Sequence, residues 1–367
     1  QFSEWEEIYS SLVEWDLKIS DRSMEGLDSI ISEQYQVANK NFERYIKENY
    51  SSWIENKSTN PILSKDIMNH YIFPDLKENK KTAIIILDCL RLDQWTIIED
   101  ELKKKYNIDT KYALSMLPST SLYSRNSIFS GVTALDLSND YPDQWKLMNS
   151  KESNMNAFEE DLLIENLMRN NLGHKSIAYS KINNYKDGAS LLLRISEYND
   201  KDLIAVVVNF VDILGHSRSE SQIIKEIVPT EKSFRKTVLQ WFNDSWISDL
   251  LNRMDGRKII FTTDHGSVKV GRPIAVSADR ETSSGLRYKK GKNIKISEKD
   301  GLLIRDPEKY GLPKSFNNEN FILACADKYL LYPNDYNYYA RKFEDSFQHG
   351  GISLEEMLLP VGILDRS

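Results

Sequence analysis

Lys258–Gly266, KIIFTTDHG, is the stretch of sequence that decides the fold: an apolar run leads into Asp264, His265 and a glycine. The run Ile259–Phe261 has the composition of a buried strand. In open α/β sheets, ligands bind beyond the carboxyl ends of the strands, and adjacent Asp and His side chains there suit a metal ion. The stretch therefore predicts a strand of a parallel sheet that ends at a metal site.

Two other apolar segments end in the same way. Ala83–Leu87 runs into Asp88, and Leu203–Val211 runs into Asp212, with His216 four residues further on. Since the carboxyl ends of parallel strands meet at one edge of a sheet, we expect these side chains to join Asp264 and His265 in a single site. A cap of the following turn or helix is the alternative role for Asp88 and for Asp264.

Strand and helix patterns alternate from Thr82 onward, which predicts an α/β fold with a mostly parallel sheet flanked by helices. Besides the three strands above, the predicted strands are Thr110–Leu117, Ser176–Tyr179 and Pro360–Leu364. The predicted helices are Trp95–Lys105, Ser121–Ser130, Phe158–Asn171, Gly188–Tyr198, a long region Ser219–Met254 and Leu354–Leu358. Residues 267–345 break the alternation, and we interpret them as an insertion.

The first part of the chain is helical instead. Apolar residues recur at helical spacing in Ser3–Lys18 and in Met24–Glu55, and Ser64 predicts the cap of a third helix that Pro74 should end. The bundle is interpreted as a spacer or dimerisation element. The predicted domains are a three-helix bundle over residues 1–77 and an α/β domain over residues 78–367.

Composition describes an ordinary globular chain of 367 residues, with 40% hydrophobic and 28% charged residues and a net charge of -7. That charge argues against general electrostatic binding to nucleic acid or membranes. Cys89 and Cys325 form no CxxC pattern, so we expect no disulfide framework. The apolar runs fall short of the roughly 20 residues that span a bilayer, and the polar start has no signal-peptide pattern. We expect a cytoplasmic protein, with further residues upstream of Gln1.

A candidate nucleophile lies in Pro118–Ser121, PSTS, just before a predicted helix. A helix amino end offers free N–H groups to a phosphate. Ser121 and Arg125 share a helical face, so the guanidinium is predicted to hold phosphate oxygens while the hydroxyl attacks. An ordinary N-cap is the alternative role for Ser121. Two divalent ions would balance three aspartates and a serine alkoxide, and would lower the pKa of that hydroxyl.

Basic residues gather around Tyr288, in the segment 280–295. Most such runs are solvated loops; if this one folds over the metals, it is a lid or a site for further phosphates of a nucleotide or oligonucleotide. The basic residues are Arg280, Arg287, Lys289, Lys290, Lys292 and Lys295.

The order of these motifs, ending in His349-Gly350-Gly351, resembles the alkaline phosphatase superfamily, and most closely its PglZ-domain branch. The resemblance covers most of Thr82–Ser367. It implies two metal ions, zinc or else manganese. One ion would be held by Asp212, His216 and His349, and the other by Asp88, Ser121, Asp264 and His265.

The same resemblance implies that Ser121 is the nucleophile, because it lies ten residues before Gly131. Relatives commonly carry threonine at this position. The departure leaves Thr120 and Ser119 as alternative nucleophiles.

A helical bundle ahead of a PglZ domain also resembles the PorX response regulators of the type IX secretion system. These carry an amino-terminal receiver domain, which is absent here, so we expect the chain to start after one. The resemblance implies a sensor kinase acting through that receiver, a homodimer and a sigma factor as partner.

The leading hypothesis is a zinc-dependent phosphodiesterase that acts on nucleotides or oligonucleotides as the output domain of a two-component response regulator. The first alternative is a non-catalytic signalling module that binds a sigma factor and uses its metals structurally. A second alternative is a phosphomutase acting on a small sugar phosphate, although the chain shows no separate cap domain of the usual size.

Overall fold

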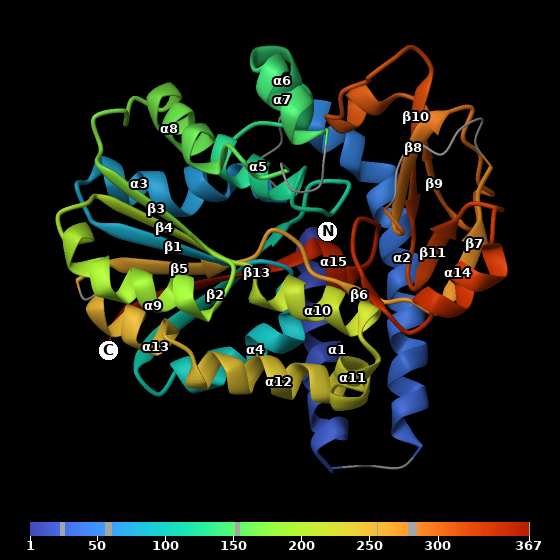
Figure 1. Ribbon diagram of the computed structural model, residues 1–367, viewed down its shortest axis with the longest axis horizontal. Coiled ribbons are helices and arrows are strands. Elements are labelled where there is room, and N and C mark those ends of the chain that lie inside the picture. The colour runs from blue at the N-terminus through green and yellow to red at the C-terminus, as the bar shows by residue number, and fades with distance from the viewer. Residues whose placement is uncertain (23–25, 56–60, 151–154, 255, 278–284, 367) are drawn as a thin grey trace.

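The computed structural model describes residues 1–22, 26–55, 61–150, 155–254, 256–277 and 285–366. A six-stranded sheet with helices on both sides forms the main body (Figure 1). Two long antiparallel helices, α1 (Phe2–Arg22) and α2 (Leu27–Glu55), cross this body and protrude from it. A smaller β-rich lobe lies on the other side of α2.

The sheet has the strand order β2-β13-β5-β1-β4-β3. The strands β5, β1, β4 and β3 run parallel to one another. Strand β13 is antiparallel to both of its neighbours, β2 and β5. The predicted α/β fold with a mostly parallel sheet is therefore confirmed. The strands are β1 (Thr82–Leu87), β2 (Tyr106–Leu114), β3 (Ile177–Ile182), β4 (Leu203–Val208), β5 (Lys258–Thr262) and β13 (Leu358–Arg366).

Helices cover both faces of this sheet (Figure 1). On one side lie α3 (Phe73–Lys77), α5 (Ser124–Ser130) and α8 (Glu159–Arg169), with α6 (Ala134–Asp140) and α7 (Pro142–Met148) beyond them. On the other lie α4 (Leu92–Leu102), α9 (Tyr185–Arg194), α12 (Glu231–Asp244) and α13 (Ile247–Arg253). The remaining helices of this body are α10 (Phe210–Glu220), α11 (Gln222–Ile227) and α15 (Leu354–Met357).

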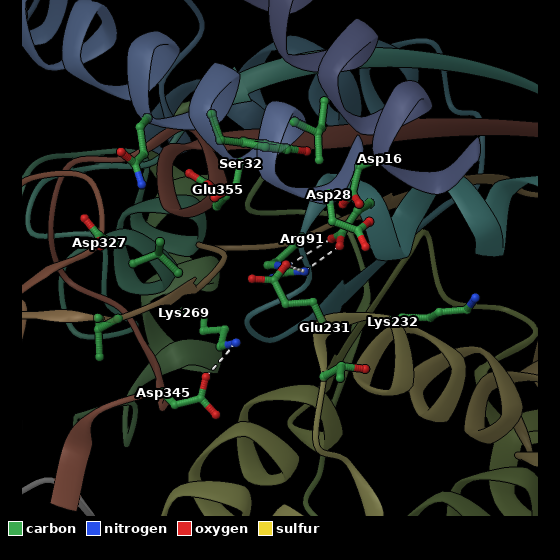
Figure 2. Close-up of a pocket in the computed structure, with 18 of the residues that line it drawn as sticks. Asp16, Asp28, Ser32, Arg91, Glu231, Lys232, Lys269, Asp327, Asp345 and Glu355 are labelled. Carbon is green, nitrogen blue, oxygen red and sulfur yellow. Dashed lines mark hydrogen bonds and ion pairs between the residues drawn. The ribbon is translucent and has the colours of Figure 1, made fainter. Parts of the chain in front are cut away.

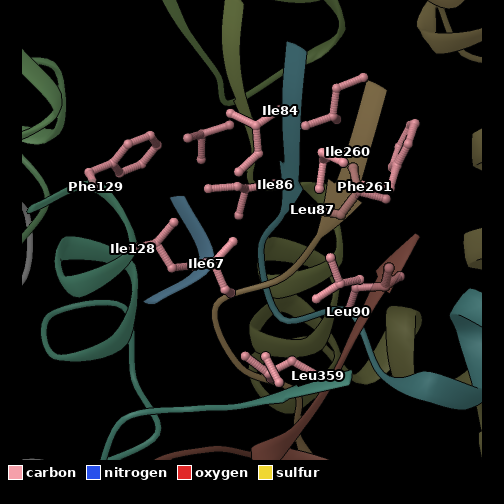
Figure 3. Packing of buried hydrophobic residues seen from close by; sticks show 14 of the residues in the cluster. Ile67, Ile84, Ile86, Leu87, Leu90, Ile128, Phe129, Ile260, Phe261 and Leu359 are labelled. Carbon is pink, nitrogen blue, oxygen red and sulfur yellow. The ribbon is translucent and has the colours of Figure 1, made fainter. Parts of the chain in front are cut away.

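Burial on both faces explains why the central strands read as unbroken apolar runs. All six residues of β1 and of β4 are buried. Ile84 and Ile86 of β1 pack with Ile260 and Phe261 of β5, and Ile128 of α5 lies in the same core (Figure 3). This core fixes the ends of β1 and β5, where the predicted site residues begin.

The long region Ser219–Met254, predicted as helical, is divided into the end of α10 and the helices α11, α12 and α13. Pro229 lies between α11 and α12, and Thr230 caps α12 by accepting a hydrogen bond from the Ser233 N–H. Proline lacks the backbone donor that a continuous helix needs, which accounts for the break.

The predicted helix end at Pro74 is wrong. The segment continues as a 3-10 turn (Ser64–Asp66), a π-helical turn (Met68–Ile72) and α3. The Phe73 N–H donates to the Met68 carbonyl, so the chain is widened just before the proline. Pro74 then lies in the first turn of α3, where its missing N–H costs no hydrogen bond.

The first two predicted helices are present as α1 and α2, which pack through aromatic residues such as Trp5 and Phe42. The third segment also contacts the sheet domain: Ser64 Oγ lies 2.7 Å from Ser124 Oγ of α5. The predicted boundary at residue 77 stays a prediction. Among the described helices, none combines the length and the apolar character needed to cross a bilayer.

In the segment 267–345, predicted as an insertion, the described residues 267–277 and 285–345 form the β-rich lobe. Lys47 of α2 donates to the carbonyls of Glu298 and Gly301, each at 3.3 Å, so α2 lies against this lobe as well as against the sheet domain. The elements are β6 (Val268–Lys269), β7 (Arg272–Ala275), β8 (Tyr288–Lys292), β9 (Gly301–Ile304), β10 (Glu319–Ala324), β11 (Lys328–Leu331) and α14 (Tyr336–Phe343), with β12 (Phe347–Gln348) pairing back onto β6.

Glu355 of α15 provides a test of the contact between α2 and the sheet domain. Burial raises its pKa to about 7 from an ordinary 4.5, and Glu231 adds to the rise, while Asn39 and Arg91 oppose it. The folded state therefore binds this proton more tightly, and the stability it contributes is lost as the pH rises between those two values. We expect Glu355→Gln to flatten the pH dependence of the melting temperature in this interval. If the melting temperature changed with pH equally in the mutant and the wild type, Glu355 would not be the group with the raised pKa.

Candidate metal and phosphoester site

Two of the predicted carboxylates lie just beyond the ends of strands. Asp88 comes after β1, and Asp264 follows β5 by two residues. The run Leu203–Val211 predicted that Asp212 directly follows a strand, but β4 already ends at Val208. Asp212 lies in the first turn of α10 instead. Asp212 and His216 are thus four apart on a helix, which places both on one face.

The first candidate metal site joins Asp88, Asp264 and His265, whose ligand atoms lie within 4.8 Å of one another. His265 Nε2 lies 3.6 Å from Asp88 Oδ1 and 3.5 Å from Asp264 Oδ2. The other ring nitrogen, Nδ1, lies 3.1 Å from the Gly266 carbonyl. If Nδ1 donates to that carbonyl, Nε2 carries the lone pair that a metal needs.

The second candidate site joins Asp212, His216 and His349 within the same limit. Asp212 Oδ1 lies 3.4 Å from His216 Nε2 and 3.5 Å from His349 Nε2. The rings of His349 and His265 stack with their centroids 4.2 Å apart. The two clusters therefore adjoin, and all predicted histidine and aspartate ligands are brought together.

The chemistry of these side chains fits a divalent cation. Asp264 Oδ2 and His349 Nδ1 are buried and have no hydrogen-bond partner among the described residues. Burial raises the pKa of Asp264, and the neighbouring Asp88 raises it further. Buried polar atoms normally make hydrogen bonds, so a buried carboxylate oxygen that makes none, within a group of candidate ligands, is consistent with a site for a cation, although the Arg125 guanidinium already lies 3.8 Å away.

The pKa values of His265 in the first cluster and of Asp212 in the second are both lowered, for different reasons. Burial, reinforced by His349, lowers the pKa of His265 to about 3, which keeps its ring neutral and able to bind a metal. Burial alone would raise the pKa of Asp212, but hydrogen bonds from His216 and His349 outweigh it and hold that pKa well below its usual range. Both groups are thus in the protonation state of a metal ligand.

Ser121 lies in the turn that precedes α5, because the helix begins at Ser124 and not at Ser121 as predicted. Its Oγ lies 3.4 Å from Asp88 Oδ1 and 3.2 Å from His265 Nε2. Of the alternative nucleophiles, Ser119 donates to the Gly351 carbonyl at 2.9 Å and is fully buried. Thr120 Oγ1 is buried without a partner among the described residues. Ser121 is therefore the hydroxyl that lies against the ligand cluster.

Arg125 was predicted to hold phosphate, but it is 3% exposed and contacts protein acceptors. Its Nη1 lies 2.6 Å from Asp88 Oδ2 and its Nε 2.5 Å from Glu159 Oε1. Its Nη2 donates to Asn156 Oδ1 at 3.0 Å. These contacts orient Asp88 and occupy most of the guanidinium, so direct binding of phosphate by Arg125 stays a prediction.

Two residues of this network, Glu159 and Asn156, were not predicted from the sequence. Glu159, buried in the first turn of α8, also contacts Lys181 Nζ at 2.9 Å and accepts a hydrogen bond from the Tyr179 hydroxyl. Asn156 Nδ2 donates to the Ser121 carbonyl at 3.2 Å. Glu159 opens an acidic run that reads as an ordinary helix start, so its burial beside Arg125 has no local signal.

The match to known families agrees with this geometry. Residues 67–363 match the model of the BREX system PglZ alkaline phosphatase-like domain. The chain belongs to this PglZ family. Residues 1–54 match the PorX response regulator linker domain, so the helices α1 and α2 form such a linker. Both resemblances seen in the sequence are confirmed.

The chain is also similar to solved structures, at low sequence identity. Murine ectonucleotide pyrophosphatase/phosphodiesterase 5, in complex with AMP, is 12% identical, with 77% of this chain and 87% of that chain covered and a TM-score of 0.47. Phosphonoacetate hydrolase from Sinorhizobium meliloti, in complex with phosphonoformate, is 10% identical, with 78% and 90% covered and a TM-score of 0.46. No curated protein sequence shows a significant match.

The ligand clusters of the PglZ domain line a cavity of about 560 Å³, a size suited to a small organic ligand. The polar lining beyond the predicted ligands includes Asn156, Lys181, Asn183 and Asn209. Gly285, Leu286 and Tyr288 form part of the wall, so the segment predicted as a basic lid does reach the site.

The basic residues of that segment are directed elsewhere. Arg287 is buried in an ion pair with Glu356, 2.6 Å away. Lys289 Nζ lies over the Tyr332 ring at 4.5 Å, and Lys290 donates to Asn149 Oδ1 at 2.9 Å. None of the three is among the described residues that line the cavity, so the structure gives no support to the alternative in which they bind further phosphates. Lys292 and Lys295 are exposed, and Arg280 lies outside the described residues.

Proposed function

We propose that the chain is a metal-dependent phosphodiesterase that acts on nucleotides or oligonucleotides. The observation that carries the proposal is the position of Ser121 Oγ, 3.4 Å from Asp88 Oδ1 and 3.2 Å from His265 Nε2, where two clusters of ligands adjoin. A hydroxyl in this position is the usual arrangement for transfer of a phosphoryl group to serine.

Two divalent ions, zinc or else manganese, would lower the pKa of the serine hydroxyl and offset the charge of the phosphate. Asp88, Ser121, Asp264 and His265 would hold one ion. Asp212, His216 and His349 would hold the other. Arg125 keeps Asp88 oriented through its Nη1, and Asn156 holds the backbone of the turn that carries Ser121.

The reaction proceeds in two displacements. Ser121 Oγ loses its proton to water and bonds to phosphorus, and the bond from phosphorus to the leaving alcohol breaks, with a proton from water completing that alcohol. A second water then attacks phosphorus, the bond to Ser121 Oγ breaks, and a phosphomonoester is released as the hydroxyl regains its proton. Asn209 and Lys181 add polar groups to the lining of the cavity next to Ser121.

The match of residues 1–54 to a PorX linker supports a place for this activity in signalling. In the proposal, the chain is the output part of a two-component response regulator of type IX secretion. A sensor kinase would act through a receiver domain, and a homodimer and a sigma factor would be the further partners. The division into a bundle ending near residue 77 and a catalytic domain after it belongs to the same proposal.

Metal dependence tests the proposed function. We expect the protein to release nitrophenol from bis-p-nitrophenyl phosphate faster than from p-nitrophenyl phosphate. Removal of bound metal with a chelator should reduce turnover to the uncatalysed background, because the acidified hydroxyl and the charge balance are lost. Addition of Zn²⁺ or Mn²⁺ should restore it. Undiminished turnover in protein shown to be metal-free would contradict the proposal.

A further inference from the structure

One helix outside the catalytic domain reaches the segments that carry the ligands. Asn39 of α2 is 3% exposed, and both polar atoms of its side chain are used. Its Oδ1 accepts a hydrogen bond from the Leu354 N–H at 2.8 Å, and its Nδ2 donates to Glu355 Oε2 at 2.9 Å. Asn39 therefore holds the first turn of α15 from the linker side.

The short helix α15 in turn contacts the loop that follows Asp264 and His265. The Gly266 N–H donates to the Glu356 carbonyl at 3.0 Å. A Cβ atom at Gly266 would lie 2.0 Å from the Glu355 carbonyl oxygen, so loop and helix are in direct backbone contact. Any displacement of α15 must move this loop, because packed backbone cannot be compressed.

The segment leading into α15 also holds the turn of the nucleophile. The Gly351 N–H donates to Glu356 Oε1 at 2.9 Å, while Ser119 accepts from the Gly350 N–H at 3.2 Å and donates to the Gly351 carbonyl at 2.9 Å. His349 directly precedes these two glycines. One short segment thus connects His349, the loop after His265 and the turn before Ser121.

A second contact from α2 reaches the same turn. The Tyr50 hydroxyl accepts a hydrogen bond from the Leu117 N–H at 2.9 Å, four residues before Ser121. The linker is docked separately through α1, where Asp16 pairs with Arg235 at 2.8 Å and Arg235 with Asp93 at 3.2 Å. Asp16, Glu355, Arg91 and Glu231 line one cavity between the linker and the catalytic domain (Figure 2).

From these contacts we propose that Asn39 is a positioning residue of the metal site, through which the linker helix α2 controls the affinity for metal and the rate of the reaction. The proposal rests on the proposed function, because it needs the ligand clusters to bind metal. Coupling of this kind is reciprocal: a linker position that favours α15 in its present place favours the bound metal, and the reverse.

The test uses a substitution that removes both hydrogen bonds and a pair that rebuilds them. Asn39→Leu is close in shape but has no polar atoms. The double variant Asn39→Asp/Glu355→Gln offers a carboxylate to the Leu354 N–H and an amide donor from Gln to that carboxylate, so both bonds are kept. Glu355→Gln alone also keeps them. Asp16→Asn is the matched control, since it weakens the docking of α1 and leaves α15 alone.

Each variant is measured for Zn²⁺ affinity against a chromogenic chelator, for the visible absorption of bound Co²⁺, and for kcat and KM, at a temperature where all are folded. We expect Asn39→Leu to lose about tenfold in metal affinity, the lower end for residues that orient ligands, with an altered Co²⁺ spectrum. Its kcat should fall with KM unchanged, because Asn39 touches no substrate. The double variant, Glu355→Gln and Asp16→Asn should match the wild type.

Wild-type affinity and spectrum in Asn39→Leu would overturn the inference. So would a double variant as impaired as Asn39→Leu, or an equal loss in Asp16→Asn, which would indicate general loosening of the linker. If Asn39→Leu does not fold, Asn39→Ala takes its place. A wild type that binds no metal would refute the proposed function itself, whereas a wild type that binds metal with all variants alike would refute only the role of Asn39.

Discussion

Ser121→Ala is expected to lower the turnover of bis-p-nitrophenyl phosphate by a factor on the order of 10³ or more, as the loss of the nucleophile does in hydrolases that use one. The hydroxyl lies 3.4 Å from Asp88 Oδ1 and 3.2 Å from His265 Nε2, and without it no bond from the protein to phosphorus can form. Asp and His ligands remain in the variant. Bound metal, measured by elemental analysis, should therefore stay close to the wild-type content.

The neighbouring hydroxyls provide the controls for this substitution. Thr120→Val should keep most of the turnover, and Ser119→Ala should lose less than Ser121→Ala, since Ser119 Oγ holds Gly350 and Gly351 and does not face the ligands. A phosphorylated intermediate trapped on Ser121 would support the two-displacement route directly. A larger loss in Ser119→Ala or Thr120→Val, with metal retained, would assign the nucleophile to that residue instead.

Glu356→Leu is expected to have the largest effect on stability, a loss of about 3–5 kcal/mol, because breaking a buried ion pair leaves a charge without compensation. The Glu356 carboxylate contacts Arg287 at 2.6 Å, and both side chains are fully buried. It also accepts hydrogen bonds from the Gly351 N–H and the Ser353 hydroxyl. Urea unfolding of metal-free protein measures the change.

The matched control is the double variant Arg287→Met/Glu356→Leu. Replacing both partners by apolar side chains removes the orphaned guanidinium, so the double variant should regain a substantial part of the lost free energy. A loss below about 1 kcal/mol in Glu356→Leu would show that water reaches Arg287 and screens it.

The central strands and the gathering of the candidate ligands beyond them were predictable, because KIIFTTDHG and its two counterparts combine an apolar run with polar residues that packing does not need. The place where β4 ends was not. Phe210 and Val211 continue the apolar run of the strand, and nothing local marks the turn at Asn209 that starts α10. The four-residue step from Asp212 to His216 was the one sign of a helix there.

The partners of Arg125 could not be predicted for a different reason. Spacing placed Arg125 on the same face as Ser121, but burial depends on what packs against that face. Glu159 comes from another helix 34 residues away, and its pairing is a property of the whole fold. The same limit applies to Arg287 and Lys289, whose charges suggested a solvated or phosphate-binding segment and which are buried against residues distant in sequence.

The position of α2 between the sheet domain and the β-rich lobe decides how the chain can be divided into fragments for experiments. Phe42, Ile46 and Tyr50 belong to the same apolar core as the central strands. A fragment that spans residues 67–363 alone would expose to water the apolar surface that α2 covers. Its Leu354 N–H would also lose its hydrogen-bond acceptor, Asn39 Oδ1. A fragment that contains the PglZ domain will therefore need α1 and α2 as well, either in the same chain or as a co-expressed segment.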